Sequence, residues 1–337
     1  MNELGARLRA AREAAGVSLN VMAAKTHYSK PYLSQLERGI RAVNSDHGEA
    51  YSRVLNVSAE VLRGAPGDPL GQLLRRLGDE ADTLAPPERE RLNALINQPR
   101  SVDHSALESL GSVLGAVRRL EDETSAGHVT PMVDTQRDIV ATFAAEARSH
   151  VRPAVVGLLS ELEQYRGWLA IPGARWRQSR QHLDRAAVLA MEADDPLRLS
   201  TALSFAAYGA IRRRELRTAD ALSAAASRDT RVHTGLRTYE TYQRAEVLAR
   251  SGERIDAVRL LSEADGMVDN LPPEDELPPS GYWYTAAFFL GQHAFVLRAL
   301  GDRTGAAEAA RDCLAEMPEE WSSSEWAVRR RELAEVS

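Results

Sequence analysis

The residues that could do chemistry in this chain are few, and their spacing fits no common catalytic arrangement. One cysteine, Cys313, cannot build a zinc site alone, and no serine stands three residues before a lysine. Asp103, His104 and Ser105 are adjacent, which is not how catalytic triads are built, so we interpret them as helix-start residues. The histidines lack metal-ligand spacing; they are His27, His47, His104, His128, His150, His182, His233 and His293. We therefore predict no enzyme activity, no metal and no cofactor.

Charge is divided unevenly along the 337 residues. Residues 1–64 contain nine Lys or Arg and six Asp or Glu, a net charge of +3, so the rest carries −9 of the formal total of −6. The only two lysines, Lys25 and Lys30, both lie in this basic head. A small basic head on a larger acidic body predicts an anionic partner at one end only.

Composition indicates a globular protein of the reducing cytosol. Hydrophobic residues make up 44% and charged residues 27% of a chain long enough for two domains. A single cysteine excludes an intrachain disulfide framework. The longest nearly unbroken apolar stretch, residues 282–290, is far shorter than the roughly 20 residues that span a bilayer. The N-terminus lacks an apolar signal core. We expect a cytoplasmic protein with no membrane partner.

Five short helices are predicted in the head. Residues 2–15 carry an apolar stripe at helical spacing, and Gly16 follows it as a helix-ending glycine. Serines are predicted to cap the next four helices, which span residues 18–26, 29–38, 45–55 and 58–62. About three residues join the second and third helices. This geometry lets one helix lie in a DNA major groove while the preceding helix crosses the backbone.

The head resembles a known family. Its segments LGARLRAAREAAGVS, MAAKTHYSKPYLSQLERG and VLNVS resemble the lambda-repressor-like helix-turn-helix, also called the xenobiotic-response-element family, over about residues 3–63. The YLSQLERG run and the spacing of the upstream Arg12 carry the likeness. The resemblance implies a five-helix domain that binds double-stranded DNA. The alternative is a helix-turn-helix that has become a protein-interaction module.

The resemblance also implies roles for individual residues. Base reading falls on Lys30, Pro31 and Gln35, whose chemistry suits guanine, a thymine methyl group and adenine. Phosphate contacts fall on Ser29, Tyr32, Arg38 and Arg41. Arg12 and Glu37 are expected to form a partly buried structural ion pair. The family often has Gln where this chain has Leu19, so Asn20 is the candidate substitute. His27 stands where the family usually has glycine, and we expect it in the left-handed region.

Residues 65–132 are predicted to connect two domains. Gly64–Pro69 reads as a linker, Pro86-Pro87 and Pro99 as breaks, and Gly127 and Pro131 as the end of the region. Helices are expected between them, at residues 70–80, 88–97 and 106–121, the last capped by Asp103. The region is a hinge, a dimerisation layer or the first turns of the larger domain.

From Val133 to the C-terminus the sequence predicts helices at 135–151, 153–170, 174–193, 196–214, 216–228, 234–250, 253–270, 281–300, 302–317 and 323–335. The turns IPGARWRQSRQHL, RRRELRTADAL, RSGERIDAVRLL and ALGDRTGAAEAA look alike and follow at about 41, 38 and 49 residues. Helix pairs at such a period indicate an α-solenoid of four pairs with a terminal capping helix. It resembles a degenerate tetratricopeptide-like array. Together, head and body resemble a common actinobacterial class of regulators.

An effector pocket is predicted on the first helices of the pairs. The candidates are aromatic or polar and are Tyr239, Tyr242, Gln243, Glu246, Arg250, Tyr284, Phe288 and Gln292. The alternative is that most of these aromatics are solenoid core. No asparagine falls mid-helix on a first helix, which argues against a clamped linear peptide and leaves a small molecule, a protein or no ligand. The acidic, proline-rich residues 272–279 form a lid, a partner site or only a loop.

These patterns together predict an all-α, sequence-specific transcription regulator. Its domains are residues 1–64 (helix-turn-helix), 65–132 (linker and connecting helices) and 133–337 (tetratricopeptide-like array). We expect a homodimer on a palindromic DNA operator, modulated through the array, with activation or repression left open. The alternative is a helical-repeat scaffold or adaptor whose main partner is another protein.

Overall fold

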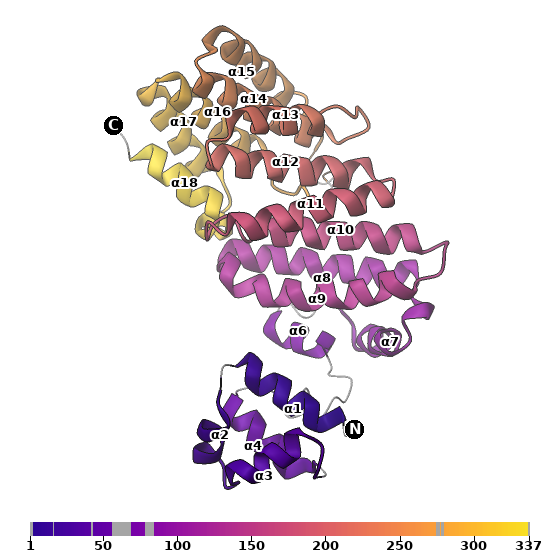
Figure 1. The fold of residues 1–337 in the computed structure, drawn as a ribbon. Helices are drawn as coiled ribbons and strands as arrows, with labels where there is room; N and C mark the ends of the chain where they lie inside the picture. Colours follow the sequence, from indigo (N-terminus) through magenta and orange to yellow (C-terminus); the bar gives the residue numbers. More distant parts are fainter. Residues whose placement is uncertain are drawn as a thin grey trace. The chain divides into compact units, whose positions relative to one another are not determined.

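The computed structural model describes residues 3–15, 17–41, 43–55, 69–77, 84–273, 277 and 280–335. These residues form helices and turns and contain no strand, so the predicted all-α class is confirmed (Figure 1). Contacts divide the chain into two compact units, Met1–Pro69 and Leu70–Ser337.

The smaller unit packs its described helices around one small apolar core. The helices are α1 (Glu3–Ala14), α2 (Leu19–Lys25), α3 (Lys30–Glu37) and α4 (Ser45–Leu55). The buried core is Leu8, Met22, Leu33, Leu36, Tyr51 and Leu55. Helices α1 and α3 approach so closely that a Cβ added at Gly5 would stand 2.2 Å from the carbonyl oxygen of Leu36. The predicted last turn at residues 58–62 lies outside the described residues.

Side-chain caps set the helix starts in this unit. Ser18 and Ser29 begin α2 and α3 as predicted, because their hydroxyls accept hydrogen bonds from the backbone N–H groups of Val21 and Tyr32. In α4 the capping residue is Asn44, whereas the sequence predicted Ser45. Asn44 Oδ1 accepts from the backbone N of His47 at 3.1 Å, and His47 Nδ1 accepts from the backbone N of Asn44 at 3.0 Å. This reciprocal pair is a capping box with histidine in the place of glutamate.

The larger unit is a stack of helices. They are α6 (Pro69–Leu77), α7 (Pro86–Asn97), η2 (Pro99–Ser101), α8 (His104–Glu123), α9 (Ala126–Glu146), α10 (Arg152–Trp168), α11 (Trp176–Glu192), α12 (Pro196–Arg212), α13 (Leu216–Ala226), α14 (Thr234–Ser251), α15 (Arg254–Val268), α16 (Ala286–Leu300), α17 (Arg303–Glu316), η4 (Glu319–Ser323) and α18 (Glu325–Ala334). Pro86-Pro87 does not only break the chain, since it forms the first turn of α7, where a missing N–H costs little.

Helix α9 corrects the sequence prediction most clearly. Gly127 and Pro131 were expected to end the connecting region, and a helix was expected over residues 135–151. The structure instead has one helix from Ala126 to Glu146 with Pro131 inside it, capped by Ser125. Proline inside a helix costs roughly 3 kcal/mol. The cost is offset because this helix buries side chains such as Val129, Met132 and Phe143 in the core formed with α8 and α10.

Helices α8 to α17 form five consecutive pairs (Figure 1). The first helices of the pairs contact one another in the order α8, α10, α12, α14 and α16, so they make one continuous inner layer. Helix α18 contacts α16 and α17, and η4 contacts α8, which brings the C-terminal end of the array back to its start. The pair α8 and α9 therefore belongs to the array, which begins before Val133, where the sequence predicts its start.

The turns within the pairs share a left-handed residue. Ala174, Arg214, Gly252 and Gly301 all have positive φ, between 52° and 90°, at matching places in the four similar turns. His27 was expected to adopt this conformation as well. It is not among the positive-φ residues of the described chain, so its turn closes with ordinary backbone angles.

Candidate functional site

The helix-turn-helix is formed by α2, α3 and the short segment between them. Met22 of α2 packs with Leu33 and Leu36 of α3 in the core. Pro31 lies in the first turn of α3, and Gly39, with φ of 71°, follows its end. One side of α3 is therefore held against the unit, and the opposite side is left for contacts with another molecule.

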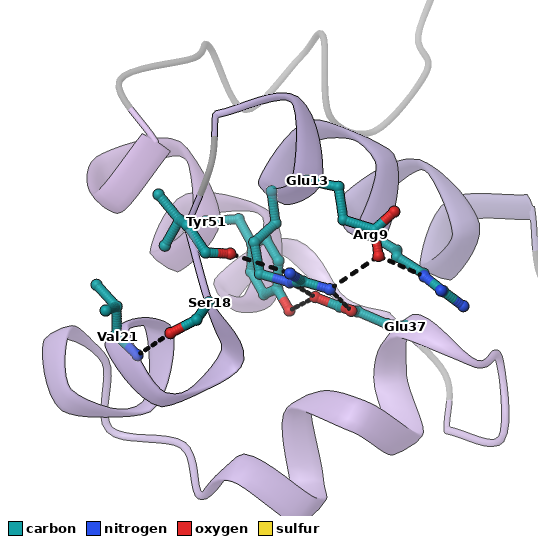
Figure 2. A network of polar contacts seen from close by, with 8 residues as sticks. Arg9, Glu13, Ser18, Val21, Glu37 and Tyr51 are labelled. Carbon is teal, nitrogen blue, oxygen red and sulfur yellow. Dashed lines mark hydrogen bonds and ion pairs between the residues drawn. The ribbon is translucent and has the colours of Figure 1, made fainter.

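A buried ion pair joins α1 to α3 (Figure 2). Arg12 donates through Nε to Glu37 Oε1 and through Nη2 to Oε2, both at 2.7 Å, and through Nη1 to the Val17 carbonyl at 3.0 Å. Tyr51 of α4 adds a hydrogen bond from its hydroxyl to Glu37 Oε1 at 2.8 Å. Burial and this carboxylate raise the pKa of Tyr51. The network contains the Arg12–Glu37 pair that the family resemblance implied, with Tyr51 as a further member.

The outward side of α3 carries the residues proposed for base reading. Lys30 and Pro31 are exposed, and Gln35 is partly exposed. Gln35 Oε1 accepts a hydrogen bond from Arg41 Nε at 2.7 Å, so the structure brings this base-reading candidate and a phosphate-contact candidate together. Its amide nitrogen is not used in that bond.

The other phosphate-contact candidates surround this pair. Ser29, Arg38 and Arg41 are exposed, as is Asn20 on α2. The Arg41 guanidinium lies over the Tyr32 ring, 4.8 Å from its centroid, and the ring stacks on Tyr28 at 5.3 Å. The ring contacts therefore hold Tyr32 and the exposed Arg41 in fixed positions next to each other.

His47 supports this aromatic surface and was not singled out in the sequence. Its Nδ1 accepts from Asn44, so in the neutral ring Nε2 carries the proton and donates to the Tyr32 hydroxyl at 3.0 Å. Burial lowers the pKa of His47, which agrees with a neutral ring. The capping-box spacing from Asn44 to His47 was the available signal, although histidine is not the residue usually sought there.

A cavity opens on the inner layer of the larger unit. It measures about 860 Å³ including its open mouth, and side chains of α8, α10, α12, α14, α16, α18 and the segment before α16 line it. The part of this space that a water-sized sphere can occupy is about 80 Å³, which is room for several water molecules or a small ligand group. Five residues of the predicted pocket lie on its wall: Tyr239, Gln243, Glu246, Phe288 and Gln292.

The other three predicted pocket residues do not line the cavity. Tyr242 donates to Asp265 at 2.7 Å and stacks on Phe289. Tyr284 is buried against Gly235, where an added Cβ would meet the tyrosine at 2.8 Å. Arg250 forms an ion pair with the wall residue Glu246 at 2.7 Å but does not line the cavity itself.

Sequence reasoning missed most of the cavity wall. The missed polar residues are Arg118, Glu121, Asp122, Gln164, Ser280, Arg329 and Arg330, and the missed aromatic residues are Tyr165, Trp168, Phe205, Tyr208, Tyr282, Trp283, Phe295 and Trp326. The charges at 118, 121 and 122 lie on one side of α8. A charged helix face normally indicates solvent, but here side chains of α10 and the return of the C-terminal segment to α8 cover it.

Two adjacent carboxylates of this wall are electrostatically unusual. Burial and the neighbouring Asp122 raise the pKa of Glu121 to about 7. Burial raises the pKa of Asp122 to about 6, although the Tyr282 hydroxyl stabilises its charged form. Near neutral pH the pair therefore exchanges protons readily, a property expected of groups that meet a charged ligand.

Comparison with known proteins identifies the smaller unit. Residues 3–64 match the helix-turn-helix domain family, and they form a helix-turn-helix domain. Two curated proteins from different strains of Mycobacterium tuberculosis, each named an uncharacterized HTH-type transcriptional regulator, are 45% identical over 58 residues. The match covers 17% of this chain and spans only 41% of the length of those relatives.

Solved structures offer distant likenesses to the whole chain. The SHP pheromone receptor Rgg2 of Streptococcus dysgalactiae is 13% identical, with a TM-score of 0.28 over 78% of this chain and 99% of that chain. Bacillus thuringiensis PlcR, solved with the peptide PapR7 and DNA, is 10% identical, with a TM-score of 0.26 over 99% of this chain and 100% of that chain. Likenesses this distant support no conclusion about ligands of this protein.

Membrane-spanning helices and metal clusters are both absent from the described part of the chain. None of its helices is both long and apolar enough to cross a membrane. Within the same residues, no three His, Cys, Asp or Glu side chains are grouped so that they could hold a metal ion.

Proposed function

We propose that this protein is a cytoplasmic, sequence-specific DNA-binding regulator of transcription with no catalytic activity of its own. The observation that carries the proposal is the helix-turn-helix domain of residues 3–64, whose α3 turns exposed polar residues outward. Its basic net charge suits a polyanion.

The proposed roles on α3 follow from the donors it presents. Lys30 donates to guanine O6 or N7, and the Pro31 ring packs on a thymine methyl group. Gln35 holds Arg41 through Oε1, so its amide N–H groups are the ones free to donate to purine N7. Ser29, Tyr32, Arg38, Arg41 and Asn20 contact phosphates and set the register of the domain.

We further propose a homodimer on a palindromic operator. One such domain reads too few base pairs for specificity, whereas two domains can read half-sites about one helical turn apart. The helical array supplies dimerisation, effector sensing or both. Its cavity supports a small-molecule effector, and binding there would change the spacing of the two DNA-binding domains.

The first experiment is genome-wide in vitro DNA capture with the full chain and a Lys30→Ala/Gln35→Ala variant. We expect the wild type to enrich a discrete inverted repeat. Removing the two base-reading side chains should lower affinity for that repeat, by roughly tenfold to a hundredfold for each of them. Gln178→Ala, an exposed change on α11 in the larger unit, is the matched control and should capture the same sites.

Salt dependence separates base-reading from phosphate-binding residues. Arg38→Ala should weaken binding evenly across sequences and reduce the slope of log K against log salt by about 0.9. A wild-type protein that is folded and enriches no repeat, while a pull-down yields one stoichiometric protein partner, would favour the scaffold function instead.

A further inference from the structure

Two carboxylates on the cavity wall have no cation to pair with among the described residues. Glu121 and Asp122 of α8 are only 6% and 5% exposed. Glu121 accepts two long hydrogen bonds, from the Tyr165 hydroxyl and the Trp168 indole N–H, both at 3.4 Å. Asp122 accepts one from the Tyr282 hydroxyl. The two carboxylates therefore accept three side-chain hydrogen bonds from the described residues, and both line the cavity.

The arginines of the same wall are already engaged. Arg118 pairs with Glu161 at 2.9 Å and lies over the Tyr165 ring. Arg329 donates to the Tyr208 hydroxyl at 2.8 Å and stacks 4.3 Å from the centroid of Phe295. Arg330 donates to the backbone carbonyls of Trp326 and Phe288. Its buried Nε has no hydrogen-bond partner among the described residues. Within the described part of the chain, none of these three guanidinium groups forms an ion pair with Glu121 or Asp122.

Aromatic rings surround these carboxylates. Trp168 lies 5.4 Å from Phe205 and 5.8 Å from Tyr208, and all three line the cavity. Rings of this kind attract a cation through their faces and pack against an apolar body. Gln164, also on the wall and only 4% exposed, has an Nε2 group with no hydrogen-bond partner among the described residues. A buried amide nitrogen without a partner, next to two carboxylates without an ion pair, indicates a site that is completed by a bound ligand.

We propose that this cavity binds a small organic cation, with its ammonium group held by Glu121 and Asp122 and its apolar or aromatic body packed against Trp168, Phe205 and Tyr208. An anion would meet two buried carboxylates that have no ion-pair partner among the described residues. Binding energy comes from pairing the buried charges and from desolvating the apolar body.

Contacts between distant parts of the chain lie near this cavity. Tyr282 bonds to Asp122 across 160 residues of sequence, and Arg212 of α12 pairs with Glu325 of α18 at 2.8 Å. These contacts bound the cavity on its C-terminal side. A second groove, lined mainly by α8, α10 and α12, shares Gln164 and Ser280 with it.

The inference rests on the proposed function only for its regulatory meaning, since binding is measured without DNA. The probes are 2-phenylethylamine, tryptamine and benzyltrimethylammonium, compared with neutral 2-phenylethanol and anionic 3-phenylpropanoate. Isothermal titration with the full chain at pH 7.5 should show at least one cation binding about tenfold or more tighter than the alcohol, and no binding of the carboxylate.

Variants locate the site. Glu121→Gln and Asp122→Asn should each weaken cation binding about tenfold or more, whereas Glu192→Gln, an exposed ion-pair residue on α11, should not. Equal binding of the alcohol or the carboxylate would overturn the proposal. So would unchanged affinity in both wall variants, or no cation binding below about 1 mM. Because these outcomes involve no DNA, failure to find an operator would count against the proposed function alone.

Proton release is a second readout. The groups that face Glu121 and Asp122 are Arg118 and Glu123 on α8, Tyr165 on α10, Tyr282 before α16 and Glu325 on α18. Protons on the carboxylates must leave when the ammonium ion binds, so cation affinity should rise from pH 5.5 to 7.5. If cation affinity did not change with pH and the binding heat were the same in all buffers, the carboxylates would not be the groups that hold the cation.

Discussion

A carboxylate on a helix that faces DNA would repel phosphate unless the protein holds it elsewhere. Glu37 is turned inward and accepts from Arg12 and Tyr51, so α1, α3 and α4 meet at one side chain. Both charges are nearly fully buried, at 8% and 5% exposure. Their value lies in the orientation of α3, because a buried ion pair adds little net stability over an apolar pair of the same size.

Removing one partner should therefore destabilise the smaller unit strongly. We expect Arg12→Ala to cost it about 3 kcal/mol, because Glu37 stays buried with only a hydroxyl donor. All five tryptophans lie after residue 150, so tryptophan fluorescence reports only the larger unit, while far-UV circular dichroism reports both. Urea unfolding should shift the dichroism transition and leave the fluorescence transition in place. If the dichroism transition of Arg12→Ala coincided with that of the wild type, the Arg12–Glu37 ion pair would not be needed for the stability of this unit.

His47 gives the smaller unit a pH dependence of known sign. Its pKa is lowered by burial, so the unfolded chain binds the proton more tightly than the folded one. The stabilising contribution is fully present above the unfolded pKa of about 6.5 and is lost as the pH falls below it. Protonation places a hydrogen on Nδ1, which then cannot accept from Asn44.

We expect the stability of this unit to decline between about pH 6.5 and 5, with the His47 ring titrating below its usual range in an NMR titration of the full chain. His47→Gln keeps an acceptor at the same capping position and should remove this part of the pH dependence. An unchanged pH profile in that variant would assign the effect to other groups.

At the level of secondary-structure elements, four of the five helix pairs turn through one left-handed residue each. Gly252 and Gly301 occupy that position in two turns, where a Cβ would meet no atom within 4 Å. Ala174 and Arg214 occupy it in the two earlier turns, with φ of 52° and 61°. A side chain in this conformation costs roughly 1–2 kcal/mol, so these two turns store strain that the packing of the array overcomes.

Arg214→Gly should raise the stability of the larger unit by about 1 kcal/mol, because relief of the strained φ exceeds the added entropy of the unfolded chain. Gly252→Ala, the matched change in the reverse direction, should lower it by a similar amount. Thermal unfolding followed by tryptophan fluorescence measures both. A destabilised Arg214→Gly protein would mean that the arginine side chain contributes more than its backbone costs.

In the molecule as a whole, the two candidate sites lie in separate compact units. The smaller unit carries the candidate DNA contacts on a few exposed side chains. The larger unit assembles a single wall from five inner helices and the C-terminal helix, so a ligand there can touch most of the array at once. Such a site suits a regulator, because differential contacts with one ligand can favour one arrangement of many helices.

The all-α class, the caps at Ser18, Ser29 and Asp103, and the turns that repeat along the array are all predictable from local sequence. These features depend on residues within about four positions of one another, where hydrogen-bonding and backbone preferences act directly. The Arg12–Glu37 pair came from family resemblance instead, since 25 residues separate its members.

The course of α9 and the composition of the cavity depend instead on packing between distant segments of the chain. Pro131 ends a helix by local preference, yet burial between α8 and α10 keeps α9 continuous. Glu121 and Asp122 look like a solvated helix face until η4 and Tyr282, which is 160 residues from Asp122, cover them. Tyr242 and Tyr284 lie on the same helices or segments as wall residues but point into packing contacts. Which side of a helix is buried depends on distant partners, and no local pattern contains that information.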